Sequence, residues 1–108
     1  MWNETDPGAV RGHLEQAVAD DVLFVDPLNV TRGHDEMEAM VLELRREQPT
    51  ARFDLASDYD GHHGRYRYRW NMYVDDALTV EGFDVTTVND DGLIERIDGF
   101  FGALTETG

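Results

Sequence analysis

The sequence has no cysteine, no lysine and only three prolines among its 108 residues. Without cysteine, the chain can form neither a disulfide, nor a thiolate nucleophile, nor a zinc site with thiolate ligands. No apolar run approaches the roughly 20 residues of a membrane-spanning helix, and the N-terminus lacks the basic start and apolar centre of a signal peptide. We therefore expect a cytoplasmic protein with no membrane partner.

The charge of the chain is strongly one-sided. Its 23 acidic residues face only 9 basic ones, all of them arginine, and the formal net charge is −14. Such a surface repels phosphate backbones, so we expect no nucleic-acid partner. With 41% hydrophobic residues and only short polar gaps, residues 1–108 are expected to form a single domain. A chain of this length buries about 60–70% of its unfolded surface.

Two segments show the apolar spacing of amphipathic helices. The first is expected from Pro7 to Ala19, because Asp6 is a good N-cap and proline is favoured at the first helical position. The second is expected from His34 to Gln48 and should end before Pro49. Its apolar residues recur at i, i+3, i+4 and i+7, and they are Met37, Met40, Val41 and Leu44. This stripe is more typical of a face packed on a sheet than of a ligand site.

The remaining segments alternate as β-strands do. A strand is expected at Val22–Asp26, followed by a loop at Leu28–Gly33. Further strands are expected over 51–57, over 65–74, over 77–88 and over 93–101, with turns between them. The order is thus helix, strand, helix and four antiparallel strands. It predicts an α+β domain with helices packed on one face of a curved antiparallel sheet.

The segment Arg65–Asp84, RYRYRWNMYVDDALTVEGFD, has the strongest strand pattern and reads as a long hairpin turning at Asp75 and Asp76. Period two places the polar residues Arg65, Arg67, Arg69 and Asn71 on one face. It places the apolar residues Tyr66, Tyr68, Trp70 and Met72 on the other. Asp84 lies in the second strand of this hairpin, so the register decides which face its carboxylate joins.

Two registers are open for this hairpin. A two-residue turn at Asp75 and Asp76 puts Arg67 opposite Asp84, which would make Asp84 an ion-paired strand residue of low pKa. A three-residue loop, or a bulge at Gly82, shifts the pairing by one residue. Asp84 then faces the aromatic side of the hairpin.

Four stretches of the sequence resemble the nuclear transport factor 2-like superfamily, which includes ketosteroid isomerases and SnoaL-like polyketide cyclases. They are WNETD at Trp2–Asp6, ADDVLFVDP at Ala19–Pro27, RGHDEMEAM at Arg32–Met40 and GFDVTTVNDDGLIERIDGFFG at Gly82–Gly102. The resemblance implies a cone-shaped, cystatin-like roll with helices on the concave face of the sheet. The chain begins where the long first helix of those isomerases would end. No residue here therefore matches their tyrosine donor.

The resemblance also implies a site. Asp26 falls where the isomerases have their proton-shuttling aspartate, and Asp84 falls where they have a protonated aspartate that donates to the substrate oxyanion. These two are the candidate catalytic residues, and the pocket-facing register of Asp84 is favoured by the resemblance. The candidate ligand-binding residues are Phe24, Tyr66, Tyr68, Trp70 and Met72. The structural alternative for Asp26 is an Asp-Pro strand terminator that accepts hydrogen bonds from nearby backbone.

We accordingly expect a domain that binds an apolar small molecule, such as a steroid or polyketide, without a cofactor or a bound metal. If it is an enzyme, we expect an isomerase or cyclase that moves a proton next to a carbonyl by aspartate acid/base catalysis. The alternative is a non-catalytic ligand-binding or dimerisation module of the same fold. Many relatives are homodimers, which makes a homodimer the expected assembly.

Overall fold

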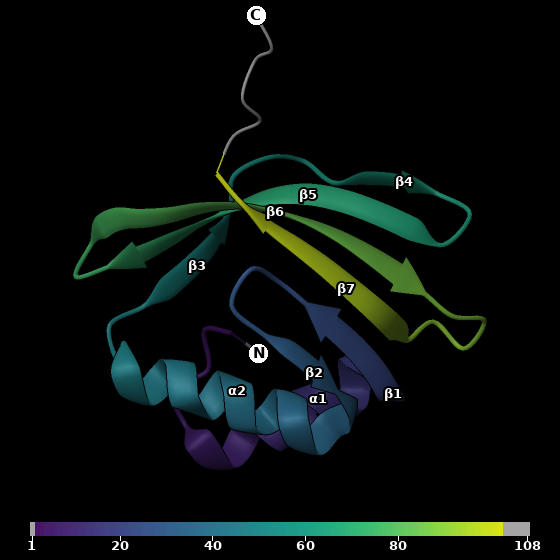
Figure 1. The fold of residues 1–108 in the computed structure, drawn as a ribbon, viewed down its shortest axis with the longest axis horizontal. Helices are drawn as coiled ribbons and strands as arrows, with labels where there is room; N and C mark the ends of the chain where they lie inside the picture. Colours follow the sequence, from purple (N-terminus) through teal and green to yellow (C-terminus); the bar gives the residue numbers. More distant parts are fainter. Residues whose placement is uncertain (1, 103–108) are drawn as a thin grey trace, which may run out of the picture.

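The computed structural model describes residues 2–102, which form two α-helices and seven strands (Figure 1). In chain order the elements are the 3-10 helix η1 (Pro7–Ala9), α1 (Val10–Ala17), β1 (Val18–Val25), β2 (Val30–Arg32), α2 (Gly33–Glu47), β3 (Arg52–Leu55), β4 (Asp60–His62), β5 (Arg65–Val74), β6 (Ala77–Val88) and β7 (Ile94–Phe101). The strands build one curved, open sheet, and the two helices lie together against one side of it. The predicted α+β class is confirmed.

The first helix begins where the sequence predicts but ends two residues earlier. Asp6 caps it, since its Oδ1 accepts a hydrogen bond of 2.9 Å from the backbone N–H of Gly8. The expected end at Ala19 was wrong. Val18 is already extended, with φ −123° and ψ 150°, and it pairs with Ile94 of β7. A β-branched residue is well suited to this switch from helix to sheet.

Helix α2 matches its prediction to within one residue at each end, and its apolar stripe divides between two environments. Met37 and Val41 are fully buried in the core. That core joins α1, β1, α2 and β7, and its members are Val10, Leu14, Val18, Val22, Phe24, Met37, Val41 and Ile97. Met40 and Leu44, on the same stripe, line a cavity instead. The apolar stripe of α2 therefore packs the helix on the sheet and also lines part of a cavity.

The strand order in the sheet is β2-β1-β7-β6-β5-β3, with β4 also paired to β5. Every pair is antiparallel except β1 with β7, so the sheet is mixed. Two three-residue strands correct the sequence interpretation. β2 lies in the segment Leu28–Gly33 expected to be a loop, and β4 lies in the turn expected before Arg65. Each of them pairs with a longer neighbour, which supplies the backbone partners.

The central hairpin combines features of both expected registers. Asp75 and Asp76 do form a two-residue turn, with φ of 51° and 62°, as type I′ turns require. The pairing then shifts, because Tyr73 lies opposite Leu78 whereas Met72 lies opposite Val80. The extra residue is Thr79, so the bulge predicted at Gly82 lies three residues earlier in the chain.

This shift settles which face Asp84 joins. Asp84 lies opposite Tyr68, and Arg67 lies opposite Val85. The guanidinium of Arg67 instead binds Asp60 of β4, with Nε 2.8 Å from Oδ1. The ion pair between Arg67 and Asp84 is therefore ruled out, and the carboxylate of Asp84 lies on the aromatic side of the hairpin.

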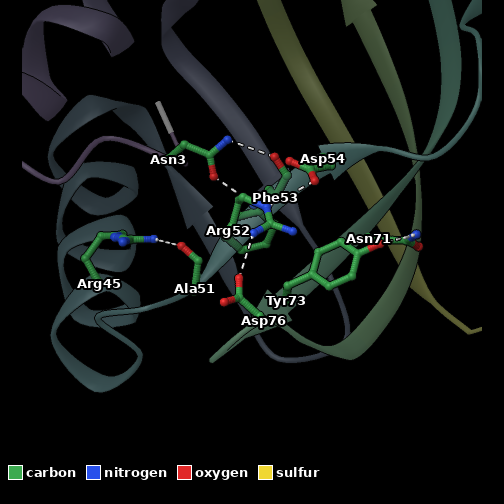
Figure 2. A network of polar contacts seen from close by, with 9 residues as sticks. All are labelled: Asn3, Arg45, Ala51, Arg52, Phe53, Asp54, Asn71, Tyr73 and Asp76. Carbon is green, nitrogen blue, oxygen red and sulfur yellow. Dashed lines mark hydrogen bonds and ion pairs between the residues drawn. The ribbon is translucent and has the colours of Figure 1, made fainter.

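The N-terminal segment and the end of α2 are both fastened to the start of β3 (Figure 2). The side chain of Asn3 donates to the backbone carbonyl of Phe53 at 2.8 Å and accepts from its N–H at 2.7 Å, as a neighbouring strand would. Arg45 of α2 donates to the carbonyls of Ala51 and Pro49. The bonds of Asn3 give hydrogen-bond partners to the backbone of Phe53 on the free edge of β3, and they hold Trp2 next to this strand.

Within residues 2–102, no helix is both long enough and apolar enough to cross a membrane.

Candidate functional site

A cavity of about 790 Å³ lies between α2 and the concave face of the sheet. Its walls come from α2, from the end of β1 and from strands β3, β5 and β6. The sheet curves around this space because β5 and β6 are long, and the bulge at Thr79 adds to their bend. A volume of this size is typical of sites that enclose small organic molecules.

Four of the five predicted ligand-binding residues line this cavity, and they are Phe24, Tyr68, Trp70 and Met72. Tyr66 is not among the described residues that line it. Its side chain is 38% exposed and lies in a shallower hollow with Tyr59 and Thr86. The ring of Tyr66 lies over Gly61 of β4, where a Cβ would come within 2.6 Å of its Cδ1. Tyr66 therefore packs on the unpredicted strand β4, with which its own residue pairs.

The aromatic wall is larger than the sequence pattern indicated. Rings follow one another from Phe24 to Trp2, Phe53, Trp70 and Phe101, with centroid separations between 5.6 and 6.0 Å. Such tilted and edge-to-face pairs are favourable ring arrangements. Phe53 lies in the strand expected over 51–57, where alternation puts it on the same face as Ala51 and Leu55. Trp2 and Phe101 come from opposite ends of the described chain, and only the fold brings them together.

Two neutral donors hold the carboxylate of Asp84. The indole Nε1 of Trp70 donates to Oδ1 at 2.9 Å, and the hydroxyl of Tyr68 donates to Oδ2 at 3.2 Å. Both donors come from β5, which pairs with the strand of Asp84. The carboxylate is therefore oriented by residues two positions apart on a single neighbouring strand.

The surroundings of Asp84 favour its protonated form. Burial raises the pKa of Asp84, and the nearby charge of Asp26 raises it further, while the bonds from Trp70 and Tyr68 lower it. The net effect is an increase, because desolvation is the largest of these causes. Burial and the charge of Asp84 also raise the pKa of Tyr68 well above its usual 10, so its hydroxyl remains a donor at neutral pH.

Asp26 directly follows β1, and it has both a structural role and access to the cavity. Its Oδ1 accepts hydrogen bonds from the backbone N–H groups of Leu28 and Asn29, at 2.9 and 2.7 Å. This is the terminator role expected as the structural alternative. Asp26 nevertheless lines the cavity, and within residues 2–102 no hydrogen bond reaches its Oδ2. One oxygen is thus used by the turn and the other is available to a ligand.

Gly99 of β7 separates the two aspartates. A Cβ at this position would lie 3.0 Å from Oδ1 of Asp84 and 3.2 Å from Cβ of Asp26. Gly99 lies opposite Asp84 in the sheet, and its neighbour Asp98 pairs with Val25, the residue before Asp26. The missing side chain therefore allows two acids from different strands to approach the same point.

No group of three histidine, aspartate or glutamate residues suited to hold a metal ion occurs in the part of the chain that the structure describes. Asp26 and Asp84 are the two carboxyl groups that lie partly buried in the cavity, with the hydroxyl of Tyr68 beside Asp84. One carboxyl has a free oxygen, and the other lies in surroundings that favour its protonation. Such a pair can act as a base and a hydrogen-bond donor toward one ligand.

The architecture, a curved sheet with two helices over a concave cavity, is that of the small cone-shaped domains to which the sequence bears a resemblance. Residues 1–97 match the model of the SnoaL-like domain. The chain belongs to the SnoaL-like family.

Solved structures support this assignment. A candidate isomerase of the SnoaL-like family from Agrobacterium tumefaciens is 34% identical, with a TM-score of 0.89 over 94% of this chain and 88% of that one. A SnoaL-like protein of unknown function from Burkholderia thailandensis is 15% identical, with a TM-score of 0.74 over 94% of this chain and 86% of that one. A candidate SnoaL-like polyketide cyclase from a Jannaschia species is 10% identical, with a TM-score of 0.72 over 93% and 78% of the two chains. At these identities the last two show the fold alone. No curated protein matches the chain.

Proposed function

We propose that the protein binds an apolar carbonyl compound in the cavity and catalyses a cofactor-free proton transfer next to the carbonyl. The observation that supports this most is the meeting of Asp26 and Asp84 across Gly99, inside an aromatic wall. The two carboxyls have different surroundings, since one keeps a free oxygen and the other is held by Tyr68 and Trp70. The candidate isomerase and cyclase among the similar structures are consistent with such chemistry.

In this proposal, Asp26 is the base. Its Oδ2 removes a proton from the carbon next to the carbonyl, the electron pair of that C–H bond forms a C=C bond, and the π electron pair of the carbonyl moves to its oxygen. The protonated Asp84, held in place by Tyr68 and Trp70, donates a hydrogen bond to the enolate oxygen that forms. The proton then returns from Asp26 to another carbon in an isomerase. In a cyclase, the enolate carbon instead forms a C–C bond with a second carbonyl, whose π electron pair moves to its oxygen, and that oxygen takes the proton from Asp26.

Exchange of the α-protons of 2-tetralone in D₂O tests this proposal without knowledge of the natural substrate. We expect the protein to accelerate the exchange, followed by proton NMR, above the rate in buffer. Asp26→Asn should lower the accelerated rate by about 10²- to 10⁴-fold, the usual contribution of a general base. Unfolding in urea and near-UV circular dichroism check that the variant keeps the fold. An unchanged rate in a folded Asp26→Asn variant would remove Asp26 as the base.

The alternative is a non-catalytic module that binds a ligand or forms a homodimer through the outer face of the sheet. Phe100 favours this second possibility, since it is 56% exposed on β7. Its neighbour Phe101 lines the cavity, so alternation places Phe100 on the opposite face.

Sedimentation equilibrium of the protein and of Phe100→Asp tests the assembly, and we expect the variant to weaken a dimer built on this face. Bound 2-tetralone without any exchange would favour the non-catalytic module.

A further inference from the structure

The groups that line the cavity have charge of one sign only. Five carboxylic acids line it, and they are Asp26, Glu43, Glu47, Asp54 and Asp84. None of the described residues that line it is an arginine or a histidine. A space with aromatic walls and only acidic charged groups repels anions and attracts cations.

Three of these five acids, Glu43, Glu47 and Asp54, have charged residues next to them at the molecular surface. Glu43 forms an ion pair with Arg46, and Asp54 forms one with Arg52, whose Nε lies 3.1 Å from Oδ2. Glu47 lies one helical turn from Glu43 on α2. Within residues 2–102, no cationic group lies within ion-pairing distance of Glu47. Its charge is therefore not neutralised by an arginine.

Arg45, two residues before Glu47 on the same helix, is turned to other partners. Arg45 donates to the backbone carbonyl of Ala51 (Figure 2) and also to that of Pro49. Glu47 is also the last residue of α2, where the helix dipole is negative and favours a cation. The C-terminal end of α2 thus adds to the negative potential at the cavity.

Exposure separates the acids into two levels. Glu43, Glu47 and Asp54 are exposed and form the mouth of the cavity, whereas Asp26 and Asp84 are partly buried farther inside. The partly buried rings of Trp2 and Phe53 are also part of the lining. A cation at the mouth would therefore have carboxylates nearby and aromatic rings in the same cavity, and both attract it.

We propose that the ligand is an apolar compound with an ammonium group, which lies near Glu47 at the mouth of the cavity. The apolar body then fills the aromatic interior, with its carbonyl next to Asp26 and Asp84. This inference rests on the proposed function, and it adds the charge of the substrate to it. Carboxylate- or phosphate-bearing compounds of similar shape are rejected by the same acids.

Three probes with one apolar body and different head groups test the proposal. They are 1-adamantanemethylamine, 1-adamantanemethanol and 1-adamantanecarboxylate, titrated into the protein while tryptophan fluorescence and heat are measured. We expect the amine to bind about tenfold more tightly than the alcohol at low salt, and the carboxylate to bind most weakly. The preference for the amine should shrink at 0.5 M salt, because the ions then screen charges over a Debye length of roughly 4 Å.

Matched variants show whether the preference comes from the mouth or from the net charge of the chain. Glu47→Gln should weaken binding of the amine by about twofold to fivefold and leave the alcohol unchanged, as expected for one exposed carboxylate. Glu95→Gln removes one exposed acid of β7 outside the cavity lining, and it should change the affinity for neither the amine nor the alcohol. Equal effects of the two variants would overturn the proposal, because the preference would then come from the whole surface.

The outcomes also separate this inference from the proposed function. If the alcohol binds as tightly as the amine, the charge preference is overturned and the apolar site remains. If none of the three probes binds and 2-tetralone is not exchanged, the proposed function fails as well. If the carboxylate binds most tightly, the proposal is wrong, since an anion would then be accepted despite the acidic mouth.

Discussion

Gly82 lies directly beneath the indole ring of Trp70. A Cβ on Gly82 would come within 2.1 Å of Cε2 of the ring, a separation that real atoms do not reach. The two residues are opposite one another in β6 and β5, so the ring crosses the neighbouring strand and brings its Nε1 to Asp84. The glycine that the sequence suggested as a bulge site thus serves a different purpose.

Gly82→Ala is expected to displace Trp70 and to lower the free energy of unfolding by about 1–3 kcal/mol, as forced overpacking does. Urea unfolding and the near-UV circular dichroism of tryptophan would show both effects. Gly12→Ala is the matched control. A Cβ on Gly12 meets nothing within 4 Å, and its place in α1 predicts a stabilisation of about 0.5–1 kcal/mol. Similar effects of the two substitutions would contradict the packing of Trp70 on Gly82.

Asp84→Asn is expected to make the protein more stable than the wild type at neutral pH. Burial raises the pKa of Asp84 above its usual 3.8, so the folded chain binds this proton more tightly than the unfolded chain. The stability from protonation is then fully present below the unfolded pKa and is lost as the pH rises through the folded pKa. Asparagine does not ionise and avoids this loss.

Urea unfolding midpoints of both proteins, measured between pH 4 and pH 8, show whether the stability difference changes with pH in the expected direction. The advantage of Asp84→Asn over the wild type should grow from pH 4 until the pH exceeds the folded pKa of Asp84, and then stay constant. Asp90→Asn removes one exposed charge from the turn before β7 and controls for the net charge of the chain. An advantage that shrinks as the pH rises would mean that the folded state favours the ionised carboxylate.

Tyr68→Phe is expected to raise the pKa of Asp84 further. The hydroxyl of Tyr68 donates to Oδ2 and lowers this pKa. Without the hydroxyl, less remains to offset the increase in pKa that burial causes. The lost hydrogen bond should also lower the free energy of unfolding by about 1–2 kcal/mol. Carboxyl ¹³C NMR titration of Asp84 measures the first effect. Tyr66→Phe is the control, because Tyr66 lies outside the lining of the main cavity, and a comparable shift in that variant would exclude a direct effect of Tyr68.

Asn3→Ala is expected to loosen the contact of the N-terminal segment with β3. It removes both hydrogen bonds between the Asn3 side chain and the backbone of Phe53 (Figure 2). The expected loss is about 1–2 kcal/mol, with a change in the near-UV signal of Trp2. Asn3→Asp keeps the oxygen acceptor and loses the donor, so its loss should be smaller. An unaltered Trp2 signal in Asn3→Ala would show that ring packing alone holds this segment.

The long elements of the fold could be predicted because each has many repeats of one hydrophobic period. α2 and β5 are the clearest cases. The strands β2 and β4 have three residues each, which is too short for a period to appear, and they form because longer strands offer them backbone partners. The parallel pairing of β1 with β7 likewise depends on contacts between distant segments.

The site could be predicted in part for the same reason. Alternation placed Tyr68, Trp70 and Met72 on one face, and all three line the cavity. The register could not be deduced, since nothing in the sequence marks Thr79 as the extra residue of a bulge. Trp2 and Phe101 were missed as wall residues because their partners lie far away in the chain.

Gly99 gives the two aspartates a fixed spacing that does not depend on any flexible loop. β1 and β6 are the two neighbours of β7, and the hydrogen bonds of the sheet set the distance across it. In the proposed function, a substrate has to match this interval, which the backbone sets. A Cβ introduced at this one position would lie 3.0 Å from Oδ1 of Asp84 and 3.2 Å from Cβ of Asp26, so even the smallest side chain requires the two acids to shift.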